Sequence, residues 1–299
     1  MATHDSRLLH ILNPSQRCRD DVKEALPLLG PDKYVWVQHE HPYHAETILR
    51  WGLQEGFQNF VVWGGDGTFH RLAQSFEELN LWERASLGLV PVGSCNDLAR
   101  HLGLRPGDIK SALQGLKSAR PARMDIGKVA WQDPESQERR SRVFTNNAGF
   151  GRSPRAIREK WGPLRNVSHF QGHSLLLQAD GQNQQGEFLL GVICNGPFFN
   201  GGLKFASDTS SSDGRLDAFF VRRSSRIRLL AQLAMGRLGV PLMNSEVVRL
   251  NGKAIVVESQ DNLWLQADGE TLDMTGNRRF EFTLMPGKLS LFMPERDPG

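Results

Sequence analysis

Five consecutive residues, Gly64-Gly65-Asp66-Gly67-Thr68, combine an anion-binding type of turn with one carboxylate. Three glycines within four positions let the main chain approach a bulky anion closely, because glycine has no Cβ and adopts positive φ angles. The N–H groups that open a following helix favour phosphate. A carboxylate here repels phosphate unless a cation or a proton lies between them, so Asp66 suggests Mg²⁺ or proton transfer. The alternative is an ordinary glycine turn capped by an aspartate.

A second polar turn, Gly93-Ser94-Cys95-Asn96-Asp97, follows the apolar run Leu87–Val92. Serine, asparagine and aspartate are common N-cap residues, so this turn alone is consistent with an ordinary helix start. Two such turns at the carboxyl ends of neighbouring parallel strands lie side by side, and together they favour a nucleotide cradle. The first turn matches neither the Walker A nor the Gly-x-Gly-x-x-Gly pattern.

Two further aspartate–glycine turns suggest metal binding and acid/base chemistry. Asp213 lies directly before a predicted strand, where its carboxylate and nearby main-chain carbonyls favour a Mg²⁺ or Ca²⁺ site. In Asp268-Gly269-Glu270 two carboxylates flank one glycine, which favours unequal protonation and therefore an acid/base role. For both turns, a purely structural turn is the alternative.

The first 123 residues predict alternating strands and helices. Apolar runs rich in β-branched and aromatic side chains indicate strands, and apolar residues at helical spacing indicate helices. The expected strands are Leu8–Leu12, Tyr34–Val37, Phe60–Trp63 and Leu87–Val92, and the expected helices are Arg17–Leu29, Ala45–Gln54 and Phe69–Leu79. This pattern predicts an α/β domain over residues 1–123, with a doubly wound, mostly parallel sheet that places both polar turns at one edge.

From Met124 onward, short apolar runs alternate with turn residues, which is typical of antiparallel sheets. The expected strands are Val129–Trp131, Val143–Asn147, Phe188–Ile193, Leu216–Val221, Val247–Leu250, Ala254–Glu258, Leu263–Gln266 and Phe280–Leu284, with one helix at Ile227–Leu238. We therefore expect residues 124–299 to form an antiparallel β-sandwich, or a barrel, whose last strand is free to return to the first domain.

The composition suits two medium domains or one large domain, because 39% of the 299 residues are hydrophobic. The net charge of +3 fits an anionic ligand or an acidic membrane surface and gives no argument for nucleic acid. Three cysteines without paired spacing indicate neither disulfides nor zinc, and favour the cytoplasm. No apolar run reaches about 18 residues, so we expect a soluble or peripheral protein.

A basic segment covers Gly151 to Phe170. Its basic residues are Arg152, Arg155, Arg158, Lys160 and Arg165. Apolar residues lie between them, a pattern that favours contact with anionic lipid head groups. The alternative is a solvated helix face.

The polar turns resemble those of a known enzyme family. Gly64–Thr68 is similar to the Gly-Gly-Asp-Gly-Thr signature shared by diacylglycerol, sphingosine, ceramide and NAD kinases. Pro91–Arg100 resembles the Pro-x-Gly-Thr-x-Asn-Asp-Phe/Leu-Ala-Arg run of soluble bacterial lipid kinases of the diacylglycerol kinase catalytic-domain family, with Ser94 replacing the threonine. His70 and Arg71 depart from the Asn-Glu that often follows the first signature. Further matches in the family's order are Asn13–Ser15, Asn146–Gly151, Asn195–Pro197, Asp213–Gly214 and Asp268–Glu270.

The resemblance implies an ATP-dependent lipid kinase that uses Mg²⁺. The residues implied to bind the nucleotide are Gly64, Gly65, Asp66, Gly67, Thr68, Ser94, Asn96 and Asp97. A metal site is implied at Asp213, with the carbonyl groups of Ser210 and Arg215 as further ligands. The implied catalytic residues are Glu270, Asp268 and Asp66. We expect Glu270 to be the base, because the glycine before it lets its carboxylate turn into a cleft between the domains.

Two other functions remain open. An NAD kinase shares the first signature, although the Asn-Asp-Leu-Ala-Arg run and the Asp-Gly-Glu turn favour the lipid kinase. A non-catalytic lipid- or nucleotide-binding relative is the other, suggested by His70 and Arg71. The sequence does not specify whether the lipid is diacylglycerol, phosphatidylglycerol or a sphingoid base. We expect a cytoplasmic protein that meets its lipid substrate by peripheral contact with the inner face of the membrane. The sequence does not decide whether the protein forms a homodimer.

Overall fold

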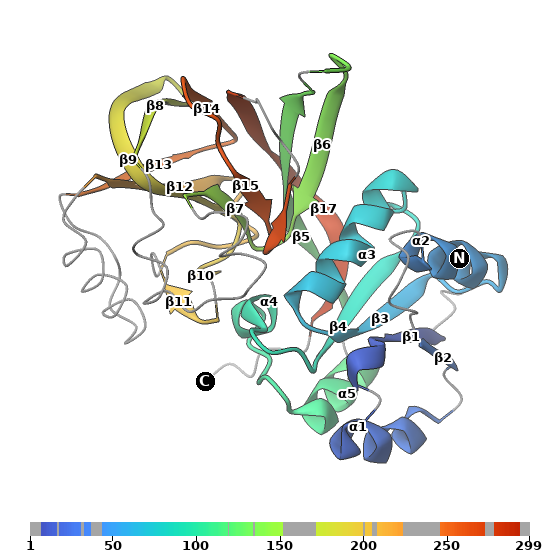
Figure 1. The fold of residues 1–299 in the computed structure, drawn as a ribbon. Coiled ribbons are helices and arrows are strands. Elements are labelled where there is room, and N and C mark those ends of the chain that lie inside the picture. Colours follow the sequence, from blue (N-terminus) through green and yellow to red (C-terminus); the bar gives the residue numbers. More distant parts are fainter. Residues whose placement is uncertain are drawn as a thin grey trace. The chain divides into compact units, whose positions relative to one another are not determined.

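The computed structural model describes residues 7–16, 18–30, 33–36, 44–118, 120–133, 135–151, 172–199, 201–204, 208–223, 246–272 and 278–293 (Figure 1). The chain divides into two compact units, Met1–Met124 with Gly287–Gly299, and Asp125–Pro286. The helix expected at Ile227–Leu238 and the basic residues expected between 152 and 170 lie outside the described residues. No helix in the described part is long and apolar enough to cross a bilayer.

The first unit is built on a parallel sheet in the order β2-β1-β3-β4. Its strands are β1 (Leu8–Leu12), β2 (Lys33–Trp36), β3 (Asn59–Gly64) and β4 (Ser86–Pro91). Near the end of the chain, Leu291 of β17 (Arg279–Met293) pairs in parallel with Leu87 of β4. All residues of β1, and five of the six in β3, are buried, as expected for a parallel sheet covered on both faces.

Helices cover both faces of this sheet, which confirms the predicted doubly wound α/β fold (Figure 1). They are α1 (Asp20–Ala25), α2 (His44–Gln54), α3 (Asp66–Glu78), α4 (Asp97–His101) and α5 (Ile109–Ser118), with short 3₁₀ turns at Pro14–Gln16 and Leu26–Leu29. Val61 and Trp63 of β3 share a core with residues of α1 and α5. On the opposite face, Gly52 of α2 lies against Phe60 and Leu9.

Two helices differ from their predicted bounds. α1 begins at Asp20 rather than Arg17 and becomes a 3₁₀ turn at Leu26, because Pro27 has no N–H to continue the α-helical ladder. α3 begins at Asp66, three residues before its predicted start, with Gly65 as the N-cap. A single residue therefore separates β3 from α3, and the Asp66–Thr68 segment is the first turn of a helix.

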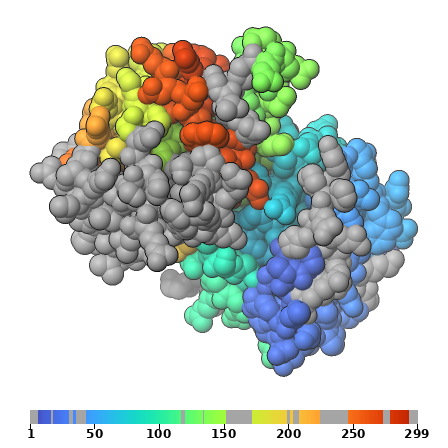
Figure 2. Space-filling view, in the orientation of Figure 1, coloured from blue at the N-terminus to red at the C-terminus, as the bar shows by residue number. Residues whose placement is uncertain are grey.

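The second unit is a largely antiparallel β domain, as predicted. Its pairing order is β16-β15-β7-β9-β8-β14-β17, with β12 joining β9 to β13 and β5 pairing with β6. The strands are β5 (Arg120–Gln132), β6 (Arg139–Phe144), β7 (Asn147–Phe150), β8 (His173–Ala179), β9 (Gln182–Cys194), β10 (Phe198–Phe199), β11 (Leu203–Lys204), β12 (Leu216–Arg222), β13 (Val247–Gly252), β14 (Ala254–Ser259), β15 (Leu265–Ala267) and β16 (Glu270–Thr271). In Figure 2 the yellow surface of β8 and β9 adjoins the orange surface of β14, in agreement with the β8–β14 pairing.

The core of the second unit contains several large aromatic side chains, among them Phe144, Phe188, Phe220 and Phe280. Each is fully buried and contributes roughly 1.5–3 kcal/mol by leaving water. The strand predicted at Val143–Asn147 covers the end of β6 and only the first residue of β7. The sequence missed β8, β10, β11 and β16. Three of these are two-residue strands, too short for any periodic pattern.

Candidate active site

The carboxyl ends of β1, β3 and β4 are held in register at one edge of the first sheet. Just past β1, the Asn13 N–H donates to the Trp63 carbonyl at 3.1 Å. Just past β4, the Val92 N–H donates to the Gly64 carbonyl at 3.1 Å. The Asn13 side-chain amide also donates to the Thr68 hydroxyl at 2.8 Å. The structure thus brings together the two polar turns and adds a third segment, Asn13, to them.

The two polar turns meet at Gly65 and Gly93. A Cβ on Gly93 would lie 2.2 Å from the Cα of Gly65, and a Cβ on Gly65 would lie 2.9 Å from the Cα of Gly93. Neither turn has space for a side-chain carbon at this point, so both glycines are required by the close approach of two main chains. The missing Cβ of Gly65, predicted to leave space for phosphate, therefore also leaves space for Gly93.

We expect Gly93→Ala to weaken ATP binding more than Gly65→Ala, because the alanine Cβ at position 93 meets backbone at the shorter distance. Gly65→Val should weaken ATP binding most. Equilibrium titration with a fluorescent ATP analogue, alongside a thermal melt of each variant, measures this order. Unchanged affinity in folded variants would remove the contact between the turns from the nucleotide site.

Asp66 joins the two turns through its carboxylate. Its Oδ2 accepts a hydrogen bond from the Asp97 N–H at 3.1 Å, and its Oδ1 accepts one from the Leu98 N–H at 2.9 Å. Both N–H groups belong to the first turn of α4, where a helix offers them no acceptor. The Asp66 carboxylate in the first turn therefore caps α4, which begins in the second turn. This contact is a structural reason for a carboxylate at position 66. Sequence reasoning missed it because the partners lie 31 and 32 residues further along.

Asn96 shapes its own turn. It is buried and adopts a left-handed conformation with φ 53°. Its Nδ2 donates to the Gly93 carbonyl at 2.7 Å, and its Oδ1 accepts from the Gly93 N–H at 3.1 Å. The Asp97 side chain is also buried, with Oδ1 3.7 Å from Nη1 of Arg100. Of the three residues predicted to bind nucleotide in this turn, only Ser94 is exposed.

The edge formed by these turns fits a phosphate-bearing ligand. α3 starts there with Gly65 as its N-cap, and glycine has no side chain with which to cap the helix. Helix N-termini at this edge of α/β sheets favour phosphate groups. Gly64, the last residue of β3, packs against the first turn of α3, because a Cβ there would lie 2.6 Å from Cβ of Thr68. The exposed Ser94 hydroxyl is a further hydrogen-bond donor on the second turn.

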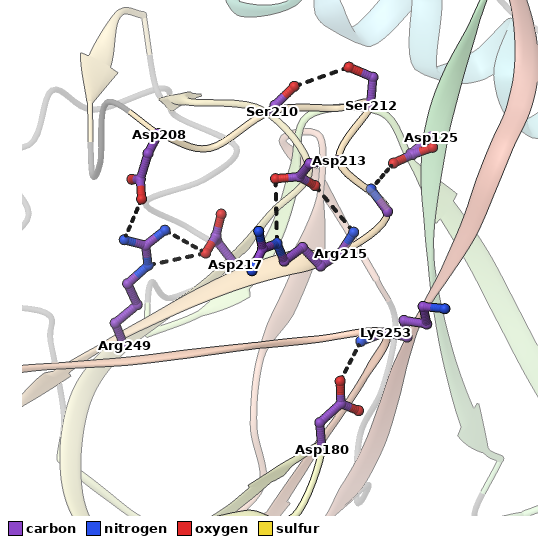
Figure 3. A network of polar contacts seen from close by, with 11 residues as sticks. Asp125, Asp180, Asp208, Ser210, Ser212, Asp213, Arg215, Asp217, Arg249 and Lys253 are labelled. Atoms are coloured by element: carbon purple, nitrogen blue, oxygen red, sulfur yellow. Dashed lines mark hydrogen bonds and ion pairs between the residues drawn. The ribbon is translucent and has the colours of Figure 1, made fainter.

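The predicted metal ligands lie on one loop of the second unit, which together with the first two residues of β12 spans residues 208–217 (Figure 3). Asp213 Oδ1 accepts a hydrogen bond from the Arg215 N–H at 3.2 Å, and its Oδ2 lies 3.8 Å from the Arg215 Nε. The Ser210 hydroxyl lies 3.2 Å from the Ser212 hydroxyl.

Asp125, at the start of the second unit, holds this loop from β5. Its Oδ2 accepts from the Gly214 N–H at 2.9 Å, and its own N–H donates to the Ser211 carbonyl at 2.7 Å. Asp125 is buried, and the sequence alone had not assigned it to the site. The turn around Asp213 is thus fixed by the main chain and the carboxylate of one residue of β5.

The electrostatics of the loop suit a hard cation. Burial raises the pKa of Asp213, and the nearby carboxylates of Asp217 and Asp125 add to this, against the opposing hydrogen bond and charge of Arg215. A divalent cation beside Asp213 would offset that repulsion. Among the described residues, no three His, Cys, Asp or Glu side chains converge on one point. Neutral oxygens and waters would therefore complete the coordination, as Mg²⁺ permits.

Asp268 is held by four hydrogen bonds. Its Oδ2 accepts from the N–H and the hydroxyl of Thr145 at 2.6 and 2.8 Å. Its Oδ1 accepts from the N–H groups of Asn146 and Asn147 at 2.9 and 3.0 Å. The side chain is buried, so this carboxylate anchors the Asp-Gly-Glu turn to the segment before β7.

Glu270 follows in a two-residue hairpin, where Asp268 and Gly269 have φ angles of 46° and 87°. Gln266 braces this hairpin, since its Oε1 accepts from the Gly269 N–H at 2.6 Å and its Nε2 donates to Asn147 Oδ1 at 3.1 Å. Glu270 is partly exposed, whereas Asp268 is committed to holding the turn. This arrangement supports Glu270 rather than Asp268 as the candidate base.

Asn195 connects the two acidic turns of the second unit. Its fully buried Nδ2 donates to the carbonyls of Asp125 and Thr145, both at 2.8 Å. Asp125 holds the Asp213 loop, and Thr145 holds Asp268. One amide group therefore joins the two segments to which both turns are hydrogen-bonded, a relation that residues 50 and 70 positions apart do not reveal in sequence.

Comparison with known families gives two matches. A model described as the diacylglycerol kinase catalytic domain matches residues 7–129. A model described as the YegS C-terminal NAD kinase beta sandwich-like domain matches residues 139–293.

Similar proteins have related descriptions. A probable lipid kinase YegS-like of Chromohalobacter salexigens is 28% identical over 310 residues, covering 98% of this chain and 94% of that protein. A diacylglycerol kinase of Bacillus subtilis is 26% identical over 230 residues, covering 72% and 71%. The crystal structure of a putative diacylglycerol kinase from Bacillus anthracis str. Sterne has a TM-score of 0.76 at 20% identity, covering 97% of this chain and 98% of that one. This last likeness confirms the fold.

Proposed function

We propose that this protein, which belongs to the diacylglycerol kinase catalytic-domain family of lipid kinases, transfers the γ-phosphoryl group of ATP to a lipid hydroxyl group. The observation that carries the proposal is the contact of the two polar turns at Gly65 and Gly93. This contact puts the N-terminus of α3 at the carboxyl edge of a parallel sheet, where phosphate-bearing ligands bind.

Phosphoryl transfer needs positioning, charge neutralisation and a proton acceptor. We assign phosphate binding to the Gly64–Thr68 segment and Ser94, with Asn96 and Asp97 shaping the second turn. Mg²⁺, when bound, neutralises charge that the phosphoryl groups carry. Asp66 would face this metal–nucleotide. Asp213, with the carbonyl oxygens of Ser210 and Arg215, would hold a separate, structural Mg²⁺ that orders its own loop.

Glu270 would accept the proton of the lipid hydroxyl. Its hairpin is fixed by the Asp268 carboxylate and the Gln266 amide, so little reorganisation is needed when a substrate binds. The lipid substrate places this reaction at a membrane surface. The proposal includes peripheral contact with the inner face of a membrane and a cytoplasmic location, and it allows either a monomer or a homodimer.

Incubation with γ-labelled ATP, Mg²⁺ and a total lipid extract tests the proposal. A labelled, chloroform-soluble product identified by mass spectrometry is expected, and it would name the lipid among diacylglycerol, phosphatidylglycerol and sphingoid bases. A parallel reaction offers NAD, because the second family model is described as NAD kinase-like. Labelled NADP with no labelled lipid would replace the proposal by the NAD kinase alternative, and no product in either reaction would favour a non-catalytic relative.

We expect Asp213→Ala to raise the Mg²⁺ concentration needed for half-maximal activity about 10-fold, because the loop loses its one carboxylate ligand. Activity should recover at high Mg²⁺. A Mg²⁺ titration of the initial rate, with Asp261→Ala as an exposed aspartate control in the same unit, measures the shift. Identical titrations for both variants would place the metal elsewhere.

A further inference from the structure

Arg249 of β13 contacts both ends of the loop that carries Asp213 (Figure 3). At the start of the loop, its Nη1 lies 3.0 Å from Oδ2 of Asp208. At the end, its Nε and Nη2 lie 3.1 and 2.8 Å from Oδ1 of Asp217. One guanidinium group therefore spans the ten residues from 208 to 217 and fixes the separation of their ends.

The two contacts of Arg249 have different surroundings. Asp217 is buried, with 2% of its surface exposed, whereas the Asp208 side chain is 64% exposed. The guanidinium carbon of Arg249 also lies 5.5 Å from the centre of the Phe219 ring, on the neighbouring strand β12. The ring and Asp217 hold the guanidinium in place, which leaves Nη1 directed at Asp208.

The charges of the loop give this contact a consequence for metal binding. Asp217 lies four residues beyond Asp213 and is buried, and a buried carboxylate is costly unless a cation pairs with it. Arg249 compensates Asp217.

We infer that Arg249 is a positioning residue for the divalent cation, because it holds the Asp208–Asp217 loop in the shape in which Asp213 and its neighbouring oxygens can bind. The inference rests on the proposed metal role of Asp213. Arg249 itself carries a positive charge and does not ligate the ion. It preorganises the loop, so that less binding free energy is spent on ordering it.

Thermal melts at increasing Mg²⁺ test the inference without turnover, since an ion that binds the folded state raises the melting temperature. Arg249→Lys keeps the charge beside Asp217 but lacks the second arm of the guanidinium. The Arg249→Lys variant should need about 10-fold more Mg²⁺ for half-maximal stabilisation. A 10-fold change in affinity corresponds to the free energy of about one charge-assisted hydrogen bond. Asp208→Asn removes only the exposed contact and should need about 2–5-fold more.

Arg223→Lys is the matched control, because Arg223 lies just beyond β12 and pairs with Glu187 at 3.0 Å. It should leave the Mg²⁺ dependence unchanged. Initial rates at saturating Mg²⁺ should return to those of the unaltered protein in both loop variants. Each of Arg249→Lys and Asp208→Asn could lower the melting temperature by the same amount with Mg²⁺ as without it. That result would overturn the positioning role of Arg249. If Mg²⁺ does not change the melting temperature of the unaltered protein, the metal site is overturned as well. The lipid assay above tests the kinase activity independently of this result.

Discussion

Glu270→Gln should lower kcat about 10²–10⁴-fold and leave ATP affinity near that of the unaltered protein. An alcohol is a poor nucleophile, and glutamine keeps the size of glutamate but cannot accept the proton. The hairpin is held by Asp268 and Gln266 rather than by Glu270, so the variant should fold normally. Single-turnover kinetics with a saturating lipid substrate, combined with equilibrium ATP binding, separate the chemical step from nucleotide affinity.

Asp268→Asn is the matched control for this experiment. The amide has one oxygen to offer where the carboxylate accepts four hydrogen bonds, so at least one buried N–H faces another donor. We expect a loss of about 1.5–3 kcal/mol in unfolding free energy and a smaller loss of kcat in the folded protein than at Glu270. A larger loss of kcat at Asp268 would reverse the two roles. Near-normal turnover in both variants would move the base elsewhere, with Asp66 as the next candidate.

Local patterns predicted most of the first domain but missed the helix α5. β3 has five buried positions out of six, and it ends at the first of the glycines. The start of α3 was placed too late, because glycine is a poor helix former and Gly67 appeared to belong to the turn. In the structure Gly67 lies in the first turn, next to an N-cap glycine.

The predicted site residues lie in three places: the pair of polar turns, the loop that carries Asp213 and the Asp268–Glu270 hairpin. Their detailed roles depend on hydrogen-bond partners that sequence spacing does not show. Asp268 finds its four donors 121 to 123 residues upstream, and Asp66 finds its two in the next turn. Asn96 was expected to face phosphate, but its amide closes a ring with Gly93. Such contacts follow from tertiary packing, whereas propensity and periodicity report only on near neighbours.

β8 shows a different limit. Its residues, His173–Ala179, alternate between buried and exposed positions, but three consecutive leucines obscure the alternation in the sequence. Leu176 is partly exposed while Leu175 and Leu177 are buried, because neighbouring side chains of a strand point to opposite faces. Pairing with β9 on one side and β14 on the other decides the structure of this segment.

Asp66→Ala should weaken ATP binding roughly 10–150-fold, because two N–H groups of α4 lose an ionised acceptor worth about 1.5–3 kcal/mol. If Asp66 also faces the metal–nucleotide, as proposed, kcat at saturating ATP should fall by a further factor of about 10² or more, since stabilisation by a metal ion is worth several kcal/mol. Thermal melts establish that the variant is folded before either quantity is measured.

Asn96→Ala separates these two contributions of Asp66. It opens the same turn by removing both hydrogen bonds to Gly93, but Asn96 is buried and has no carboxylate to offer a cation. It should therefore weaken ATP binding while kcat at saturating ATP stays within a few-fold of the unaltered value. The proposed metal role predicts that Asp66→Ala loses far more kcat than Asn96→Ala at equal ATP occupancy. Equal values of kcat in the two variants would show that Asp66 acts only by joining the turns, and would leave the neutralisation of phosphate charge to other residues.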